Sequence, residues 1–158
     1  MITLQSITSK NLWKIYNLKA DENLVAPNNK SLAEAYAYYS EHGKNPIVYG
    51  IYHDSMPVGF IMAVYNPPAG FAAINNNGQP YYYLWRFMID NEHQNKGYGK
   101  IAMNLLLAEA KESLHGEANA FYTSVVPESA VTPKFYGSFG FVKTGEVDDG
   151  EEVMRLSL

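Results

Sequence analysis

An apolar segment followed at once by a glycine-containing polar stretch and a long apolar segment is the feature that most limits the fold of this chain. The sequence reads YYYLWRFMID at residues 81–90, NEHQNKGYGK at 91–100, and then IAMNLLLAEAKE up to Glu112. Gly97 and Gly99 stand where a helix is expected to begin, although glycine costs about 1 kcal/mol relative to alanine inside a helix. We therefore expect a strand, a turn and a helix whose N-terminus receives an anionic group, such as a phosphate.

Two helices are expected earlier in the chain. In residues 9–20, apolar side chains recur at helical spacing, namely Leu12, Ile15, Tyr16 and Leu18. Residues 28–43 predict a longer helix, in which Ser31 is the cap and Glu34 completes a capping box. Gly43 marks the expected end of that helix.

Strands account for most of the remaining regular structure. Strands are expected in residues 2–7, on both sides of a turn at 53–57, in 81–90 and in 118–126. A Gly/Pro/Asn-rich loop at 66–80 precedes the strand at 81–90. After 118–126 we expect a short helix that turns at Gly140 and a terminal hairpin that closes at Asp148–Gly150. The order is β-α-α-β-β-β-α-β-α-β-β. Hairpins interrupted by one strand–helix–strand unit indicate an α+β fold with a mixed, mostly antiparallel sheet flanked by helices, and not a doubly wound parallel sheet.

Composition limits the class of partner. The chain has 158 residues, of which 47% are hydrophobic and 18% charged, which predicts one globular domain over residues 1–158. The net charge of −4 and the lack of clustered Lys and Arg argue against nucleic-acid binding. If charge attracts a partner, that partner is a cation.

Residue types and segment lengths exclude further classes. The absence of cysteine excludes disulfides, thiolate metal sites and a cysteine nucleophile. The four histidines lack metal-ligand spacing, so no metal is expected: His42, His53, His93 and His115. No segment has the pattern of a signal peptide or a membrane span, so we expect a cytoplasmic protein without a membrane partner.

The glycine motif admits three interpretations. A dinucleotide site requires G-x-G-x-x-G after the first strand, whereas this motif follows a central strand and lacks the third glycine. A nucleotide-triphosphate loop requires G-x-x-x-x-G-K-[ST], and GYGKIA has neither the spacing nor the hydroxyl. The remaining interpretation is a pyrophosphate-binding turn of the form Q-x-x-G-x-G, made by Gln94, Gly97 and Gly99.

Two separated segments together resemble a known family. LWRFMIDNEHQNKGYGKIAMNLLL is similar to the acetyl-CoA signature of the GNAT acetyltransferase superfamily, and FYGSFGF at residues 135–141 resembles that family's other recurring segment. The wording LWRFMID is also similar to bacterial polyamine acetyltransferases of the spermine/spermidine type. The resemblance implies a GNAT-like fold, acetyl-CoA as cosubstrate, and transfer of an acetyl group to a primary amine.

The resemblance also implies which residues bind the cofactor. Backbone N–H groups of residues 95–100 would meet the pyrophosphate, and the strand backbone at 87–89 would pair with the pantetheine arm and polarise the acetyl carbonyl. The expected cofactor-binding residues are Phe87, Met88, Ile89, Gln94, Asn95, Lys96, Gly97, Tyr98, Gly99, Lys100 and Ser129. For Tyr98 and Lys100 we expect packing and solubility, and for Lys96 a solvated lysine is an equal alternative. Tight helix packing is the alternative for the two glycines.

Tyr136 is the expected catalytic residue, because in KFYGSFGF it matches the family tyrosine. A phenol near sulfur can protonate the departing CoA thiolate. The sequence departs from the family pattern at two positions near this tyrosine. Ser129 stands where many relatives have an asparagine that contacts the cofactor, and Pro133 is expected to interrupt the short helix.

The acceptor and the general base are less specified. The central strand has no carboxylate, so the amine could be deprotonated by a water chain or, at a distance, by Glu34, Asp21, Glu22 or Glu128. A polyamine or diamine such as spermidine is the expected acceptor, with Glu22, Glu34, Trp85 and Glu128 as its expected contacts. Solvated helix faces are the alternative for these carboxylates. An amino acid, peptide or aminoglycoside acceptor, a non-catalytic acyl-CoA-binding domain and a homodimer all stay open.

Overall fold

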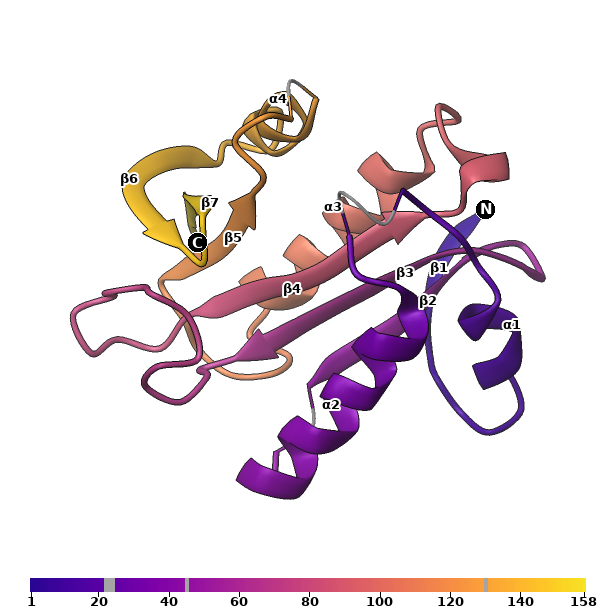
Figure 1. Cartoon of the computed structure of the whole chain (residues 1–158), viewed down its shortest axis with the longest axis horizontal. Coiled ribbons are helices and arrows are strands. Elements are labelled where there is room, and N and C mark those ends of the chain that lie inside the picture. The colour runs from indigo at the N-terminus through magenta and orange to yellow at the C-terminus, as the bar shows by residue number, and fades with distance from the viewer. Residues whose placement is uncertain (22–24, 45, 130) are drawn as a thin grey trace. The chain divides into compact units, whose positions relative to one another are not determined.

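The order of helices and strands is the one expected from the sequence. The computed structural model describes residues 1–21, 25–44, 46–129 and 131–158 (Figure 1). Its elements are β1 (Ile2–Ser6), α1 (Leu12–Tyr16), α2 (Asn28–His42), β2 (Ile47–His53), β3 (Met56–Tyr65), β4 (Tyr82–Ile89), η1 (Asn91–His93), α3 (Tyr98–Lys111), β5 (Ala120–Val125), α4 (Thr132–Gly137), β6 (Val142–Asp148) and β7 (Glu151–Ser157). The short 3-10 helix η1 is the one addition to the expected order.

The strands form a mixed sheet of the expected kind. Its seven strands follow the order β1-β2-β3-β4-β5-β7-β6. The β1–β2, β2–β3, β5–β7 and β6–β7 ladders are antiparallel, whereas β4 and β5 are parallel. The parallel ladder joins Tyr82–Leu84 to Phe121–Thr123. The antiparallel hairpins and the β4–α3–β5 crossover together make the sheet mixed and the fold α+β.

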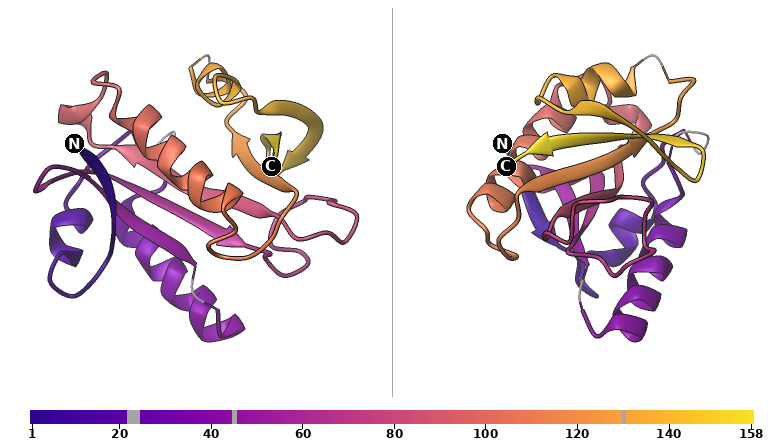
Figure 2. Two further views of the ribbon diagram at one scale, coloured as in Figure 1. Left: turned by 180° about the vertical axis from the view of Figure 1, so that it is seen from behind. Right: turned by 90° about the vertical axis from the view of Figure 1, so that its left-hand side faces the viewer.

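The chain divides into two compact units. Unit 1 comprises Met1–Ala63 and Trp85–Leu107, and unit 2 comprises Val64–Leu84 and Ala108–Leu158. Within unit 1, α2 lies in front of the strands in Figure 1, and α3 lies in front of them in the reverse view of Figure 2. Helices therefore cover both faces of the strands of unit 1.

Each unit has its own buried apolar residues. In unit 1 one cluster of buried residues in the core contains Ile15, Tyr52, Phe60, Met62 and Met88. In unit 2, Tyr82 stacks on Phe121 with ring centroids 5.4 Å apart, and Phe121 meets Phe141 edge to face. Among the described residues, no helix combines the length and the apolar character needed to cross a membrane.

Helix α2 begins earlier than expected, which makes the capping box wrong. The helix starts at Asn28 after Pro27, and Ser31 is buried within its first turns. The Ser31 hydroxyl donates to the Pro27 carbonyl at 3.2 Å, so it serves the helix backbone instead of capping it. The end at Gly43 is confirmed, with φ 63° and an N–H bond to the Tyr39 carbonyl.

Helix α1 is shorter than the predicted span 9–20. It ends at Tyr16, and the Asn17 side chain donates to the Trp13 carbonyl at 2.9 Å. The N–H of Lys19 donates to the Asp90 carboxylate at 2.8 Å. A helical continuation would require that N–H for its own hydrogen bond, so the contact with Asp90 competes with the helix.

The predicted interruption of the last helix by Pro133 is also wrong. Pro133 lies in the first turn of α4. The absent N–H of proline has no intrahelical partner at that position, and its fixed φ suits a helix start. Pro133 therefore begins α4 and does not break it.

Candidate active site

The segment after β4 forms a turn that leads directly into a helix N-terminus. Asn95 and Gly97 both have positive φ, at 61° and 77°, and α3 begins at Tyr98. A Cβ added at Gly97 would meet nothing within 4 Å, so helix packing does not explain this glycine. Its left-handed backbone does, because that conformation is strained for most L-residues. We call residues 94–100 the cradle.

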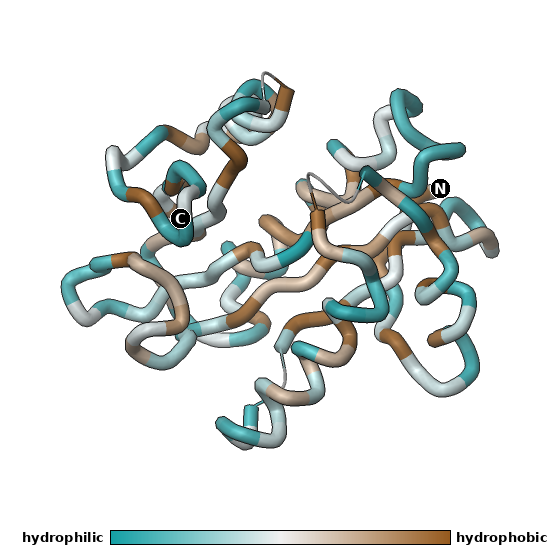
Figure 3. The backbone as a smooth tube through the Cα atoms, in the orientation of Figure 1, coloured by the Kyte–Doolittle hydropathy of each residue, from teal (hydrophilic) through white to brown (hydrophobic). Residues whose placement is uncertain are grey.

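Backbone geometry of this kind suits an anion. The first N–H groups of an α-helix have no intrahelical acceptor and carry the positive end of the helix dipole. Successive residues of alternating handedness also turn their N–H groups toward one concave side. The stretch with η1 and the cradle is polar and is drawn in teal in Figure 3. The residues present thus fit a phosphate-bearing ligand.

Side chains hold the cradle against the end of β4. Asp90 accepts hydrogen bonds from the N–H groups of Lys19 and Glu92 at 2.8 and 3.0 Å. The Gln94 amide donates to the Ile89 carbonyl at 3.0 Å and to the Asn91 side chain at 3.2 Å. The amide nitrogen of Gln94 therefore anchors the turn to the strand, a role that the motif alone did not indicate.

The other side chains of the cradle have local contacts. The Lys96 ammonium donates to the Glu92 carbonyl at 2.9 Å and lies 3.5 Å from His93 Nδ1. The Tyr98 ring stacks on His53 with centroids 4.9 Å apart and an interplanar angle of 20°. Lys100 is exposed. The stacking on His53 gives the Tyr98 ring a packing contact.

The strand before the cradle is mostly enclosed. Met88 is 5% exposed and belongs to the core of unit 1, while Phe87 and Ile89 are half-buried. All three lie beyond the Tyr82–Leu84 segment that is paired with β5. Any role for these residues in ligand binding rests on their backbone.

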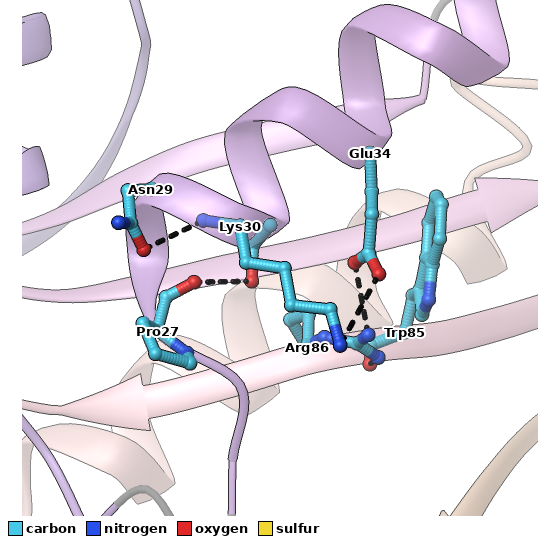
Figure 4. Close-up of polar contacts among 7 residues, drawn as sticks. Pro27, Asn29, Lys30, Glu34, Trp85 and Arg86 are labelled. Carbon is cyan, nitrogen blue, oxygen red and sulfur yellow. Dashed lines mark hydrogen bonds and ion pairs between the residues drawn. The ribbon is translucent and has the colours of Figure 1, made fainter.

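An ion pair joins α2 to β4 within unit 1 (Figure 4). Arg86 donates to the Glu34 carboxylate at 2.9 Å and to the Trp85 carbonyl at 2.8 Å. The guanidinium also lies 5.5 Å from the Trp85 ring centroid, and Trp85 meets Tyr38 edge to face. Two expected acceptor contacts, Glu34 and Trp85, are thus already engaged with Arg86.

A pocket of about 190 Å³ opens beside this region of unit 1. The buried Asn28 amide donates to the Ile15 carbonyl at 2.8 Å and lies 3.9 Å from Met88 Sδ. The lining contains apolar side chains, amides and one lysine, but no carboxylate among the described residues: Tyr16, Asn17, Leu18, Lys19, Ala20, Val25, Ala26, Pro27, Asn28, Asn29 and Met88.

Tyr136 of α4 lies in unit 2 with its ring enclosed. It is 6% exposed and meets Phe135 and Phe141 edge to face. Its hydroxyl is hydrogen-bonded to Thr123 of β5. Burial raises the pKa of Tyr136 well above its ordinary value, against the opposing effect of the Thr123 hydrogen bond. The phenol is therefore protonated throughout the ordinary pH range.

The remaining predicted site residues have varied surroundings. Ser129 accepts a hydrogen bond from the Thr132 N–H at 3.1 Å, so its hydroxyl serves the start of α4. Glu128 is exposed beside it, and Asp21 is exposed in unit 1. Glu22 lies outside the described residues. No group of three or more potential metal ligands occurs in the part of the chain that the structure describes.

Sequence reasoning missed a group of polar side chains in unit 2. Tyr83, Ser124 and Glu151 are joined by hydrogen bonds, with Asp148 next to Tyr83. They come from four different strands; Asp148 and Glu151 flank the β6–β7 turn, whereas Tyr83 and Ser124 are far from them and from each other in the sequence. No spacing rule along the chain signals such a group, because strand order alone brings its members together.

The mixed sheet and the β4–α3 turn that leads into a helix N-terminus are the arrangement that the resemblance to GNAT acetyltransferases predicted. The model of the Acetyltransferase (GNAT) family matches residues 12–141. The spermine/spermidine N(1)-acetyltransferase of Bacillus subtilis (strain 168) is 30% identical over 161 positions, which cover 99% of each chain. The chain therefore belongs to the GNAT acetyltransferase family, and it is an acetyltransferase.

Solved structures agree on the fold. A variant of the SpeG spermidine N-acetyltransferase from Vibrio cholerae has a TM-score of 0.70 at 19% identity, covering 99% of this chain and 93% of that one. The PaiA N-acetyltransferase from Thermoplasma acidophilum, in complex with coenzyme A, has a TM-score of 0.66 at 16% identity, with coverage of 100% and 99%. These likenesses confirm the GNAT-like fold predicted from the sequence.

Proposed function

We propose that the protein transfers the acetyl group of acetyl-CoA to a primary amine of a polyamine or diamine, such as spermidine. The observation that carries this proposal is the 30% identity to a spermine/spermidine N(1)-acetyltransferase over 99% of both chains. A similarity that spans whole chains covers the acceptor-binding segments as well as the cofactor motif.

The cradle supports acetyl-CoA as the donor. Its positive-φ residues Asn95 and Gly97 and the first turn of α3 offer backbone N–H groups to a pyrophosphate. The strand residues 87–89 would pair through their backbone with the peptide-like pantetheine arm. Gln94 supports this indirectly, since its amide fixes the turn to Ile89.

Tyr136 is proposed as the acid that protonates the CoA thiolate. The phenol carries its proton at neutral pH, which is the form that an acid needs, although burial raises the pKa of Tyr136 and makes that proton harder to release. We further propose that the two units act as one acetyltransferase domain over residues 1–158, since β3, β4 and α3 each contribute residues to both units. We also propose that the protein acts in the cytoplasm.

The proposal is tested by thiol release from acetyl-CoA with a panel of acceptors. The panel contains spermine, spermidine, a diamine, a monoamine, amino acids, an aminoglycoside and a peptide N-terminus. We expect kcat/KM to be highest for a polyamine and acetyl-CoA to be required. A higher value for an amino acid, aminoglycoside or peptide would overturn the acceptor class, and a lack of thiol release with all of them would overturn the function.

A further inference from the structure

The carboxylate of Glu34 is shared by two cations of unit 1, one on each oxygen (Figure 4). Oε2 accepts from the Arg86 guanidinium at 2.9 Å. Oε1 lies 3.9 Å from the Lys30 ammonium. Two cations on one anion leave a positive charge in excess, so the carboxylate cannot neutralise a further cation while both stay in place.

The contact with Lys30 is the weaker of the two. At 3.9 Å it is longer than a direct hydrogen bond, and the Lys30 side chain is 64% exposed. Lys30 also lies in the first turn of α2, where the helix dipole disfavours a cation. A lysine four residues before a glutamate is the less favourable order for a pair on a helix. Lys30 can therefore leave Oε1 at little cost.

Contacts between α2 and β4 place Glu34 beside the strand segment that is proposed to hold the acyl end of acetyl-CoA. Asn28 lies 3.9 Å from Met88 Sδ, and Glu34 pairs with Arg86. Residues 86 and 88 lie on the same face of β4, about 7 Å apart along the strand. The backbone of residues 87–89 thus lies next to the Glu34 carboxylate, within unit 1.

The Lys30 side chain has the same chemistry as one end of a diamine. It is a primary ammonium on a flexible four-carbon stem. An acceptor with one amine at the acyl group and a second ammonium at the other end of an alkyl stem presents the same group to Oε1. A monoamine has no second ammonium to present.

We propose that Oε1 of Glu34 binds the second ammonium of a diamine or polyamine acceptor, and that Lys30 is a tethered competitor for this oxygen. The inference rests on the proposed function and deepens it. Exchange of one ammonium for the other leaves the local charge unchanged, whereas binding without exchange would put three cations on one carboxylate. Arg86 stays paired and holds Glu34 in place. Lys30 is thus a specificity-determining residue, because it weakens the binding of acceptors with a second ammonium.

The test compares kcat/KM for putrescine with that for butylamine, which has the same carbon chain and lacks the second ammonium. Lys30→Met is expected to raise the putrescine-to-butylamine ratio about two- to fivefold, the effect of losing an exposed ion pair. The rise should come from a lower KM for putrescine at unchanged kcat, because the second ammonium is bound equally before and during the reaction. Lys30→Gln should behave in the same way, and Lys30→Arg should keep the ratio of the wild type.

Lys44→Met is the matched control. Lys44 is exposed in the same unit, so its replacement removes an equal charge, and the ratio should follow the wild type. A ratio that stays unchanged in both Lys30→Met and Lys30→Gln would overturn the inference. An equal rise in Lys44→Met would also overturn it, since that result would show a general effect of charge. Wild-type protein without acetyl transfer to any amine would instead overturn the proposed function, so the two failures can be distinguished.

Discussion

Arg86 of β4 and Glu34 of α2 form an ion pair with an N–O distance of 2.9 Å, and their side chains are only 20% and 28% exposed. Lys30 lies 3.9 Å from the other oxygen of the same carboxylate. In the part of the chain that the structure describes, Arg86 Nε is buried and has no hydrogen-bond partner. The guanidinium therefore depends on Glu34, and Glu34 acts first as a structural link between α2 and β4.

Replacing Glu34 with Gln is expected to lower the free energy of unfolding by about 1–3 kcal/mol, because a partly buried charge loses its partner. Urea denaturation followed by circular dichroism measures this. Glu41→Gln is the control on the same helix, since the Glu41 side chain is 76% exposed. A loss for Glu34→Gln no larger than that of the control would contradict the structural role. Glu34→Gln is for this reason a poor test of amine recognition.

Changing Gly97 separates backbone strain from charge in the cradle. Asn and Asp both tolerate positive φ better than other residues, and Asn95 already adopts it here. Gly97→Asn should fold and retain acetyl-CoA binding in large part. Gly97→Asp adds a negative charge and should weaken binding a further tenfold or more, about 1.4 kcal/mol. Calorimetric titration of both variants with acetyl-CoA measures the difference in affinity. Equal affinities would show that the cradle does not bind the phosphates.

Tyr136→Phe is expected to lower kcat while the affinity for acetyl-CoA stays close to that of the wild type. The change removes the proton donor but keeps the ring that packs against Phe135 and Phe141. An interaction made only in the transition state lowers kcat and kcat/KM together. Rapid-quench measurement of the chemical step would reveal this. A chemical step as fast as in the wild type would leave Tyr136 a packing residue.

The raised pKa of Tyr136 also makes stability depend on pH above 10. The unfolded phenol ionises near pH 10, whereas the buried phenol keeps its proton, so the unfolded state binds fewer protons and stability falls as pH rises. From pH 9 to 11 the wild type should lose about 1.4 kcal/mol more than Tyr136→Phe. Urea unfolding of both proteins at several pH values measures this difference. Parallel curves would show that the folded phenol titrates normally.

Polyamine recognition should weaken with salt. Exposed carboxylates such as Glu128 attract ammonium groups through water, and the screening length is about 10 Å at 0.1 M salt. The ratio of kcat/KM for spermine to that for a monoamine should therefore fall between low and high ionic strength. Glu128→Gln and Glu22→Gln should reduce the ratio at low salt. A ratio that does not change with salt would argue for an uncharged acceptor pocket.

The elements were predictable where local chemistry decides them. Alternating strands, the Gly43 helix end and the turn at Asp149 and Gly150, whose φ values are 47° and 85°, follow from short-range preferences. The start of α2 could not be predicted, because a serine and a glutamate at capping-box spacing indicate a cap at Ser31. In the structure, the carboxylate of Glu34 is engaged instead by Arg86, which is far away in the sequence. The end of α1 depends on Asp90, which is far away in the sequence.

The same division applies to the site. The cradle is a contiguous motif, so its turn and helix start could be read from Gln94, Gly97 and Gly99. The hydrogen bond from the Gln94 amide to the Ile89 carbonyl could not be predicted from the sequence, since it depends on where β4 ends. Tyr83, Ser124 and Glu151 meet only through strand order, and a single sequence carries no signal of that order.

Strand β6 is the last in the strand order, and its pairing with β7 shifts register between Lys143 and Val147. Gly145 within it has a φ of 87°. An irregular, charged edge offers a poor template for a strand from another molecule. Despite exposed Val142 and Val147, this edge should resist edge-to-edge aggregation when the protein is concentrated. Substitutions that regularise β6 would lower its solubility without changing its chemistry.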